Sequence, residues 1–187
     1  TKTVIITINP AAQVTPVFSE TLCDGDSTTP ITFTTSNSSG ATTYSWTNDN
    51  TSIGLVAAGS TDIGSFVVAN TSTIPQVATI VVTPTYTFNG KDCTGSPETF
   101  TITVNPSAQI DQPTSLIVCE DDIVSTINFT TLNTVGTTAY NWTNDNVNIG
   151  ISTANGTGDI GTFTALNSTS TPQVATITAQ RHRPRVR

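Results

Sequence analysis

Four aspartates have the chemistry and the repeated spacing that could bind a metal ion. One pair recurs in a second, similar segment of the chain: Asp49 and Asp62, then Asp145 and Asp159. Calcium takes several oxygen ligands, carboxylates among them, which makes each pair a candidate calcium site. The spacing matches no EF-hand loop, and short acidic side chains beside asparagine also form turns by bonding the backbone. The turn-forming interpretation is preferred, with calcium as the minority hypothesis.

The chain offers little for nucleophilic or acid–base catalysis. Its single histidine, His182, lies in residues 181–187, a basic run whose composition differs from everything before it. We expect this run to be an appended tail rather than part of the fold. With no other histidine, a Ser/His/Asp triad, a Cys/His nucleophile and a histidine-based zinc site are not expected. The sequence therefore predicts no enzyme, no catalytic residue and no bound cofactor.

The aspartates belong to a motif that occurs twice, 96 positions apart. Residues 44–54 read Tyr-Ser-Trp-Thr-Asn-Asp-Asn-Thr-Ser-Ile-Gly, and residues 140–150 read Tyr-Asn-Trp-Thr-Asn-Asp-Asn-Val-Asn-Ile-Gly. The Tyr and Trp are two apart, so in a strand both rings project from one face. The Asn-Asp-Asn that follows has turn chemistry. The motif predicts a core strand that runs into a tight turn, with Trp46 and Trp142 buried rather than exposed as sugar-stacking platforms.

A period near a hundred residues fits one small domain copied in tandem. Residues 3–10, Thr-Val-Ile-Ile-Thr-Ile-Asn-Pro, also match residues 99–106, Thr-Phe-Thr-Ile-Thr-Val-Asn-Pro. Asn-Pro closes each strand because proline cannot donate to a ladder. The predicted divisions are the closing strand of a preceding repeat (1–10), repeat one (11–106), repeat two cut before its last strand (107–180) and the tail (181–187).

The fold class follows from threonine-rich composition and from alternation. No window has sustained helical periodicity, while Gly, Pro and Asn-Gly punctuation recurs throughout. Repeat one contains about seven short strands, among them 14–18, 31–35, 63–69, 77–88 and 98–104. This pattern predicts an all-β protein of tandem immunoglobulin-like antiparallel sandwiches. The apolar residues expected in the two cores are Phe33, Trp46, Phe66, Ile80, Ile102, Phe129, Trp142 and Phe163.

Charge excludes one class of partner. The net charge is −7, and every arginine lies in the last seven residues, which leaves only Lys2 and Lys91 elsewhere. Nucleic acid is therefore not an expected partner, since its phosphates must be neutralised by Lys and Arg. No apolar stretch is long enough for a membrane span. The expected partners are neighbouring repeats of the same chain and surface polysaccharide.

The combined motifs resemble the PKD-like tandem repeats of giant surface adhesins of the flavobacterial gliding-motility type. The motifs are W-T-N-D-N-x-x-I-G, G-x-G-D-I, P-Q-V-A-T-I and T-I-T-V-N-P, and they cover nearly all of residues 1–180. The resemblance implies PKD-like sandwiches, type IX secretion and a location on the surface of a Gram-negative bacterium. The expected function is a structural stalk of an adhesin filament in gliding motility or surface attachment. The alternative is a carbohydrate-binding accessory module of a secreted polysaccharide-degrading enzyme.

Cysteines in such an exported, lysine-poor β protein suggest disulfide use. Cys23 and Cys93 both belong to repeat one, and we expect them to be bonded to each other. Cys119 matches Cys23, but the position that would match Cys93 falls beyond residue 187, so Cys119 is expected to be a free thiol.

The divisions of the chain also suggest a contact between molecules. Residues 3–8 have the alternation of a closing strand, and residues 174–179 form an edge that such a strand would cover. We therefore expect head-to-tail strand donation between fragments, because an exposed strand edge recruits another strand.

Overall fold

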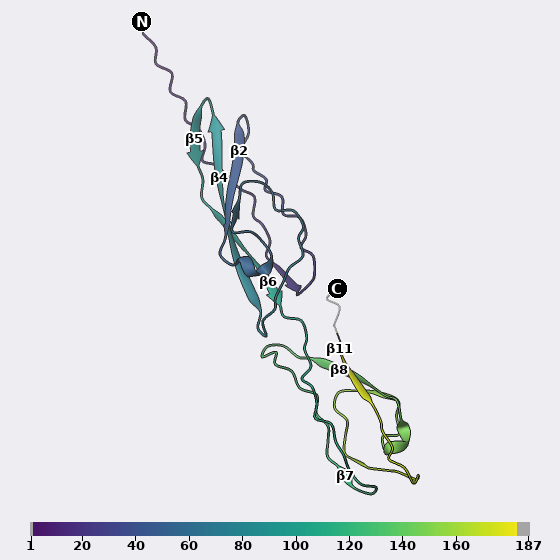
Figure 1. Ribbon diagram of the computed structural model, residues 1–187. Helices are drawn as coiled ribbons and strands as arrows, with labels where there is room; N and C mark the ends of the chain where they lie inside the picture. Colours follow the sequence, from purple (N-terminus) through teal and green to yellow (C-terminus); the bar gives the residue numbers. More distant parts are fainter. Residues whose placement is uncertain (1, 183–187) are drawn as a thin grey trace. The chain divides into compact units, whose positions relative to one another are not determined.

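The computed structural model describes residues 2–182, and in this range the chain is nearly all β (Figure 1). The helical turns among these residues are two short 3-10 helices, η1 (Thr51–Ile53) and η2 (Val147–Ile149). The chain divides into two compact units, Thr1–Ser107 and Ala108–Arg187, called unit 1 and unit 2 below. The all-β prediction is confirmed, and the division falls one residue from the boundary expected from the sequence.

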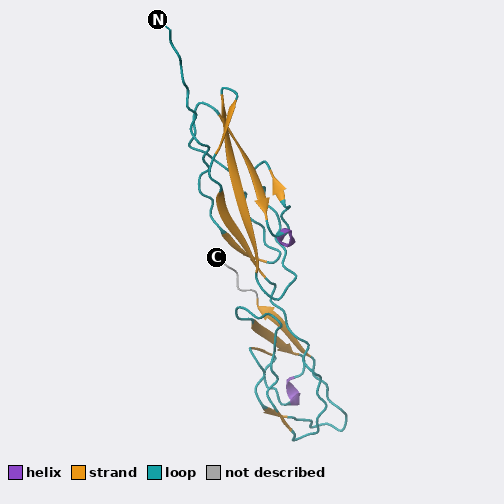
Figure 2. Ribbon diagram, turned by 90° about the vertical axis from the view of Figure 1, so that its left-hand side faces the viewer, coloured by secondary structure: helices purple, strands orange, loops and turns teal. Residues whose placement is uncertain are grey.

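The main sheet of unit 1 is built around one long strand, β4 (Gln76–Phe88) (Figure 2). The strand order is β1-β6-β4-β2-β3, with β5 paired to the far end of β4. All neighbours are antiparallel except β1 and β6, which run parallel. The other strands of this sheet are β1 (Glu20–Cys23), β2 (Ala41–Asn48), β3 (Ala58–Gly59), β5 (Lys91–Thr94) and β6 (Glu98–Asn105).

A proline inside β4 is tolerated because its position needs no N–H. Pro84 lies between the part of β4 that pairs with β6, which ends at Val82, and the part that pairs with β5, which begins at Thr85. Its carbonyl still accepts from the Gly95 amide at 3.0 Å. Proline removes only a donor, so it fits at the gap between two partner strands.

The second layer of unit 1 is less regular than the sequence predicts. Residues 14–18, 31–35 and 63–69 form no continuous strands, although Ile31 bridges Ile63 and the Thr15 amide donates to the Thr34 carbonyl at 2.8 Å. Side chains replace backbone partners here, because the Asp62 carboxylate accepts from the Phe33 amide at 2.9 Å. A side chain that takes a backbone donor interrupts the ladder. The prediction of three regular strands is therefore wrong, although all three segments pack in or against the core.

Each unit has its own apolar core between these layers. In unit 1 the core includes Phe33, Trp46, Ile80 and Ile102, all buried, with Phe66 half-buried against them. In unit 2 the residues that the sequence assigns to the core behave alike: Phe129 and Trp142 are buried, and Phe163 is half-buried against the cluster. Alternation within the strands accounts for these positions, since inward side chains recur every second residue.

Unit 2 contains a three-stranded sheet of order β11-β8-β9 and a separate pair, β10-β7. Its strands are β7 (Ile123–Val124), β8 (Ala139–Asn144), β9 (Asn155–Thr157), β10 (Phe163–Thr164) and β11 (Ile177–His182). Arg181 and His182 pair with β8, so β11 continues into the run that the sequence assigns to a tail beginning at residue 181. β11 thus extends two residues past the predicted boundary, and residues 183–187 lie outside the described range.

The predicted Cys23–Cys93 disulfide is wrong. Cys23 lies opposite Asn105, next to the start of β4, whereas Cys93 lies opposite Tyr86 near its end. About ten residues of strand separate the two places, or roughly 30 Å, far more than the 4.4–6.8 Å that a disulfide spans between Cα atoms. The parallel direction of β1 causes this, because it carries Cys23 toward the end of β6 rather than its beginning. All three cysteines are free thiols.

We expect three titratable thiols per chain when the protein is unfolded in denaturant without reductant. A chromogenic thiol assay measures this count directly. The Cys119→Ser variant is the matched control and should reduce the count to two, because neither remaining cysteine is bonded. A count of one in the unaltered protein would restore the disulfide.

Candidate functional site

The repeated tryptophan packs over a glycine on the neighbouring strand. Trp46 is 5% exposed, and its indole Nε1 donates to the Thr61 carbonyl at 2.8 Å. It lies opposite Gly59 of β3, where a Cβ atom would come within 2.4 Å of the ring. Gly156 lies beneath Trp142 in the same way, with a Cβ approach of 2.3 Å. Sequence reasoning missed this role, although both glycines occur at matching places of the two segments.

The side chain of Asn48, the first asparagine of the motif, forms hydrogen bonds with the backbone of the loop that follows it. Its side chain is buried, and Nδ2 donates to the carbonyls of Leu55 at 3.0 Å and Val56 at 3.3 Å. Its Oδ1 accepts from the Asn50 amide at 3.0 Å. Buried amides of this kind are stable only when both their donors and their acceptor are satisfied. Asn48 is therefore a structural hub rather than a ligand-binding group.

The same hub is present in unit 2. Nδ2 of Asn144 donates to the carbonyls of Ile151 at 3.2 Å and Thr153 at 3.3 Å, and its Oδ1 accepts from the Asn146 amide at 3.0 Å. Because both the residue and its bonds recur, the turn-forming interpretation of Asn-Asp-Asn explains why these residue types are present in both units.

The aspartate of the motif ties the turn to β4 in unit 1. Asp49 Oδ1 accepts from the Thr79 amide at 2.6 Å, and this backbone hydrogen bond holds the pKa of the carboxyl below its ordinary value. Asn50 then caps η1, since its Oδ1 accepts from the Ser52 amide at 3.1 Å. Gly54 ends η1 with a φ of 99°, a conformation that favours glycine. Each residue of the turn thus has a backbone partner.

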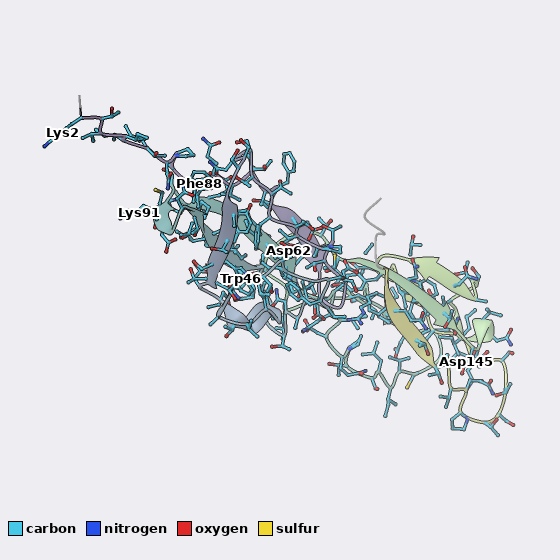
Figure 3. The ribbon with its side chains drawn as sticks, turned by 90° about the horizontal axis from the view of Figure 1, so that it is seen from above. Lys2, Trp46, Asp62, Phe88, Lys91 and Asp145 are labelled. Carbon is cyan, nitrogen blue, oxygen red and sulfur yellow. The ribbon has the colours of Figure 1, made fainter. Side chains whose placement is uncertain are left out.

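The other candidate calcium ligands also accept hydrogen bonds from backbone amides. Asp62 accepts from the Phe33 amide, and Asp159 accepts from the Phe129 amide at 2.8 Å. Asp145 accepts from the Thr176 amide at 2.6 Å, as Asp49 does in unit 1. Among residues 2–182, no group of three or more His, Cys, Asp or Glu side chains is placed to hold a metal ion. Figure 3 shows Asp62 and Asp145 among the side chains of the two units.

The two tryptophans differ in one contact. The indole Nε1 of Trp142 is buried and has no hydrogen-bond partner among the described residues. In unit 2 the place of Thr61 is taken by Gly158, whose φ of 67° turns the local backbone. A buried donor without a partner costs free energy, so this motif is better satisfied in unit 1 than in unit 2.

No two exposed aromatic rings lie parallel to each other on the described surface, as a sugar-stacking platform of paired rings would need. Tyr86 and Phe88 are nearly parallel, at 18° with centroids 6.5 Å apart, but Tyr86 is only 2% exposed. Phe18 is 90% exposed and packs against no other aromatic ring among the described residues. A shallow hollow beside Trp142 is lined by Asn141, Thr143 and Gln180 and by no charged side chain.

No protein-family model matches this chain, and no curated protein matches it. In the part of the chain that the structure describes, no helix is both long enough and apolar enough to cross a membrane.

Proposed function

We propose that this chain is part of the structural stalk of a bacterial cell-surface adhesin filament, where its β-sandwich units carry tensile load. The sequence resemblance to PKD-like adhesin repeats motivates this function. The observation that supports it is the parallel pairing of β1 and β6 in unit 1. An exported location through type IX secretion belongs to the same proposal.

The chain enters and leaves unit 1 at opposite ends of its longest strand. At the entry, Asn9 Nδ2 donates to the carbonyl of Phe88, the last residue of β4, at 3.0 Å. At the exit, Val104 of β6 lies opposite Gln76, the first residue of β4. The 13 residues of β4 therefore separate the two ends by about 40 Å. A unit with ends so placed transmits tension along its strands.

Tension on this unit loads the pairing of β1 and β6 in shear. In the chain, β1 follows the entry point and β6 comes just before the exit. Four consecutive residue pairs join the two strands, from Glu20↔Ile102 to Cys23↔Asn105. Parallel strands pulled in opposite directions along their axes must break all of these bonds together. Antiparallel strands pulled from one end separate pair by pair, which needs less force. The topology thus suits a load-bearing element.

The carbohydrate-binding alternative depends on exposed aromatic rings. Trp46 and Trp142 are 5% and 7% exposed, so neither can offer its face to a sugar. This burial favours the stalk over the accessory module, because sugar recognition by stacking needs an accessible ring face.

Single-molecule force spectroscopy tests the proposal through two pulling directions. With handles at the two chain ends, unit 1 should unfold in one event and lengthen by about 300 Å, since ~96 residues extend ~3.5 Å each and the folded unit spans ~40 Å. The control places handles at residues 27 and 107, both near the Cys23–Asn105 end of the β1–β6 pair. This direction unzips β1 from β6 and should need a clearly lower force. Equal forces would contradict the load-bearing role.

A binding assay separates the two functions. In affinity gels that contain neutral or acidic polysaccharides, the stalk proposal predicts unchanged mobility of the protein. Retardation by one polysaccharide, abolished by an aromatic substitution such as Phe18→Ala, would support the carbohydrate-binding module instead.

A further inference from the structure

Strand β11 in unit 2 presents an unpaired edge. Its partner is β8 on one side, and no strand among residues 2–182 pairs with its other side. Just before β11, the amide and carbonyl of Thr176 and the carbonyl of Val174 bond toward the β8 side, to Asp145 and Asn146. Because backbone groups alternate along an extended chain, those of Ala175 and Ile177 point to the free side.

Unit 1 shows what occupies the equivalent place. There β6 lies between β4, its antiparallel partner, and β1, its parallel partner. The inward side chains of β4 that β6 covers, Ala78, Ile80 and Val82, are fully buried. Their counterparts in unit 2, Ala175, Ile177 and Ala179, are only half-buried. The sequences of the two edges are closely matched. The difference in burial therefore follows from β6, which covers this edge in unit 1 and has no counterpart among the described residues of unit 2.

The two segments of unit 2 that correspond to the neighbours of β6 both differ from their counterparts in unit 1. β4 begins at Gln76, but β11 begins only at Ile177, so residues 173–176 lack the strand structure of their counterparts 76–79. The segment 116–119, which corresponds to β1, is also not in a strand. Its side chains Leu116, Ile117 and Val118 are exposed by 47% or more. No strand of residues 2–182 takes the position that β6 occupies in unit 1, beside residues 173–178 and 116–119, and this unfilled position is called the slot below.

Residues 3–8 have the sequence that fits this slot. They match residues 99–104 of β6, and with Asn9-Pro10 included five of eight positions are identical. These residues pair with no strand in the described chain, and Val4, Ile6 and Ile8 are each at least 80% exposed. Asn9 is tied to the β4–β5 hairpin, and the segment before it extends away from the sheet of unit 1 (Figure 1). An exposed apolar segment of this length favours pairing with an open edge.

We propose that residues 3–8 of one copy of this chain insert as a strand beside residues 173–178 of a second copy, a segment that ends in the first residues of β11. The register is that of β6 against β4, where Ile102 lies opposite Ala78 and Phe100 opposite Ile80. Carried over by sequence match, Ile6 lies opposite Ala175 and Val4 opposite Ile177. On its other side the inserted strand runs parallel to residues 116–119, as β6 does to β1.

The donor strand belongs to unit 1 and the slot to unit 2, so the contact is head-to-tail. Such contacts produce open chains or closed rings rather than two-fold dimers. The association requires neither a filament nor an adhesive function, and its degree should rise with protein concentration.

A matched pair of donor variants tests the register. Ile6→Ser places a small polar side chain where Ile102 is buried in the template, whereas Ile5→Ser alters the neighbour that replaces the partly exposed Thr101. By analytical ultracentrifugation, Ile6→Ser should raise the dissociation constant more than about tenfold, since a buried isoleucine is lost. Ile5→Ser should change it by less than about threefold, because threonine already occupies that position in β6. Equal effects of the two variants, or a monomeric unaltered chain at millimolar concentration, would overturn the proposal.

Mixing a donor variant with an acceptor variant tests the direction of the contact. Ala175→Pro removes an amide that points to the free edge and donates to no group among residues 2–182, so unit 2 should still fold. Unchanged tryptophan fluorescence and an unchanged melting temperature verify this. Ile6→Ser keeps an intact slot and Ala175→Pro keeps an intact donor, so each alone should stay monomeric while their mixture forms 1:1 dimers and nothing larger. A mixture that stays monomeric, or that forms longer chains, would exclude head-to-tail insertion.

Discussion

Replacing Trp46 by alanine should lower the free energy of unfolding of unit 1 by about 3–5 kcal/mol, the usual range for a buried aromatic residue. The indole is 5% exposed, packs over Gly59 and donates to the Thr61 carbonyl. The substitution therefore leaves a large cavity and removes the donor that holds the loop after β3.

Urea unfolding followed by two probes measures this effect. Far-UV circular dichroism reports both units, whereas fluorescence of the variant comes from Trp142 and reports unit 2 alone. The part of the circular-dichroism transition that comes from unit 1 should shift to lower urea. The fluorescence transition, which reports unit 2, should keep its midpoint. Phe18→Ala is the matched control, because that ring is 90% exposed and its loss should change the stability by less than about 0.5 kcal/mol. A Trp46→Ala variant as stable as this control would mean that Trp46 is not a core residue.

Replacing Asn48 by aspartate should destabilise unit 1 by about 3 kcal/mol or more at neutral pH. The change is almost isosteric, but it replaces a buried donor by a carboxylate oxygen. That oxygen would face the carbonyls of Leu55 and Val56, which the amide of Asn48 now satisfies. These carbonyls and that of Asn50 would then lose their donor, and a buried charge would have no partner.

The pH dependence distinguishes this mechanism from a simple loss of packing. Burial and the neighbouring carbonyls disfavour the ionised form of the introduced carboxyl, so its pKa should be raised in the folded state. The destabilisation relative to the unaltered protein should therefore shrink as pH falls, because the protonated acid can again donate one hydrogen bond. Asn89→Asp is the control, since Asn89 is exposed in the β4–β5 turn, where aspartate is equally suited. A penalty that is the same at every pH would show that the lost donor is not the cause.

Several features of the fold depend on contacts between residues far apart in the chain. The two short segments 14–18 and 31–35 alternate as strands do, yet the Asp62 carboxylate takes the amide of Phe33 and the ladder is interrupted. Propensity describes what a segment favours alone. It does not reveal that a side chain 29 positions away will compete for a backbone donor.

The cysteines illustrate the same limit of local reasoning. The sequence places Cys23 near a first strand and Cys93 before a last one, and both belong to unit 1. Whether they meet depends on the direction of β1 relative to β6, which is parallel. Strand direction is decided by the packing of the whole sheet, so a pairing inferred from cysteine count and compartment alone was wrong.

The sequence by itself determined the period of 96 residues, the all-β class, the inward positions of residues such as Ile80 and Ile102, and the turn chemistry after Trp46. These properties are local or repetitive: side chains alternate with a period of two in any strand, and short polar residues bond their own backbone in any turn. Only the tertiary structure decided that Gly59 makes room for the indole, that Asn48 reaches the carbonyl of Leu55, and that β6 takes a position beside β4 that no strand of residues 108–182 takes beside β11. Those features arise where strands and loops from distant parts of the chain meet, and each depends on which neighbour is present.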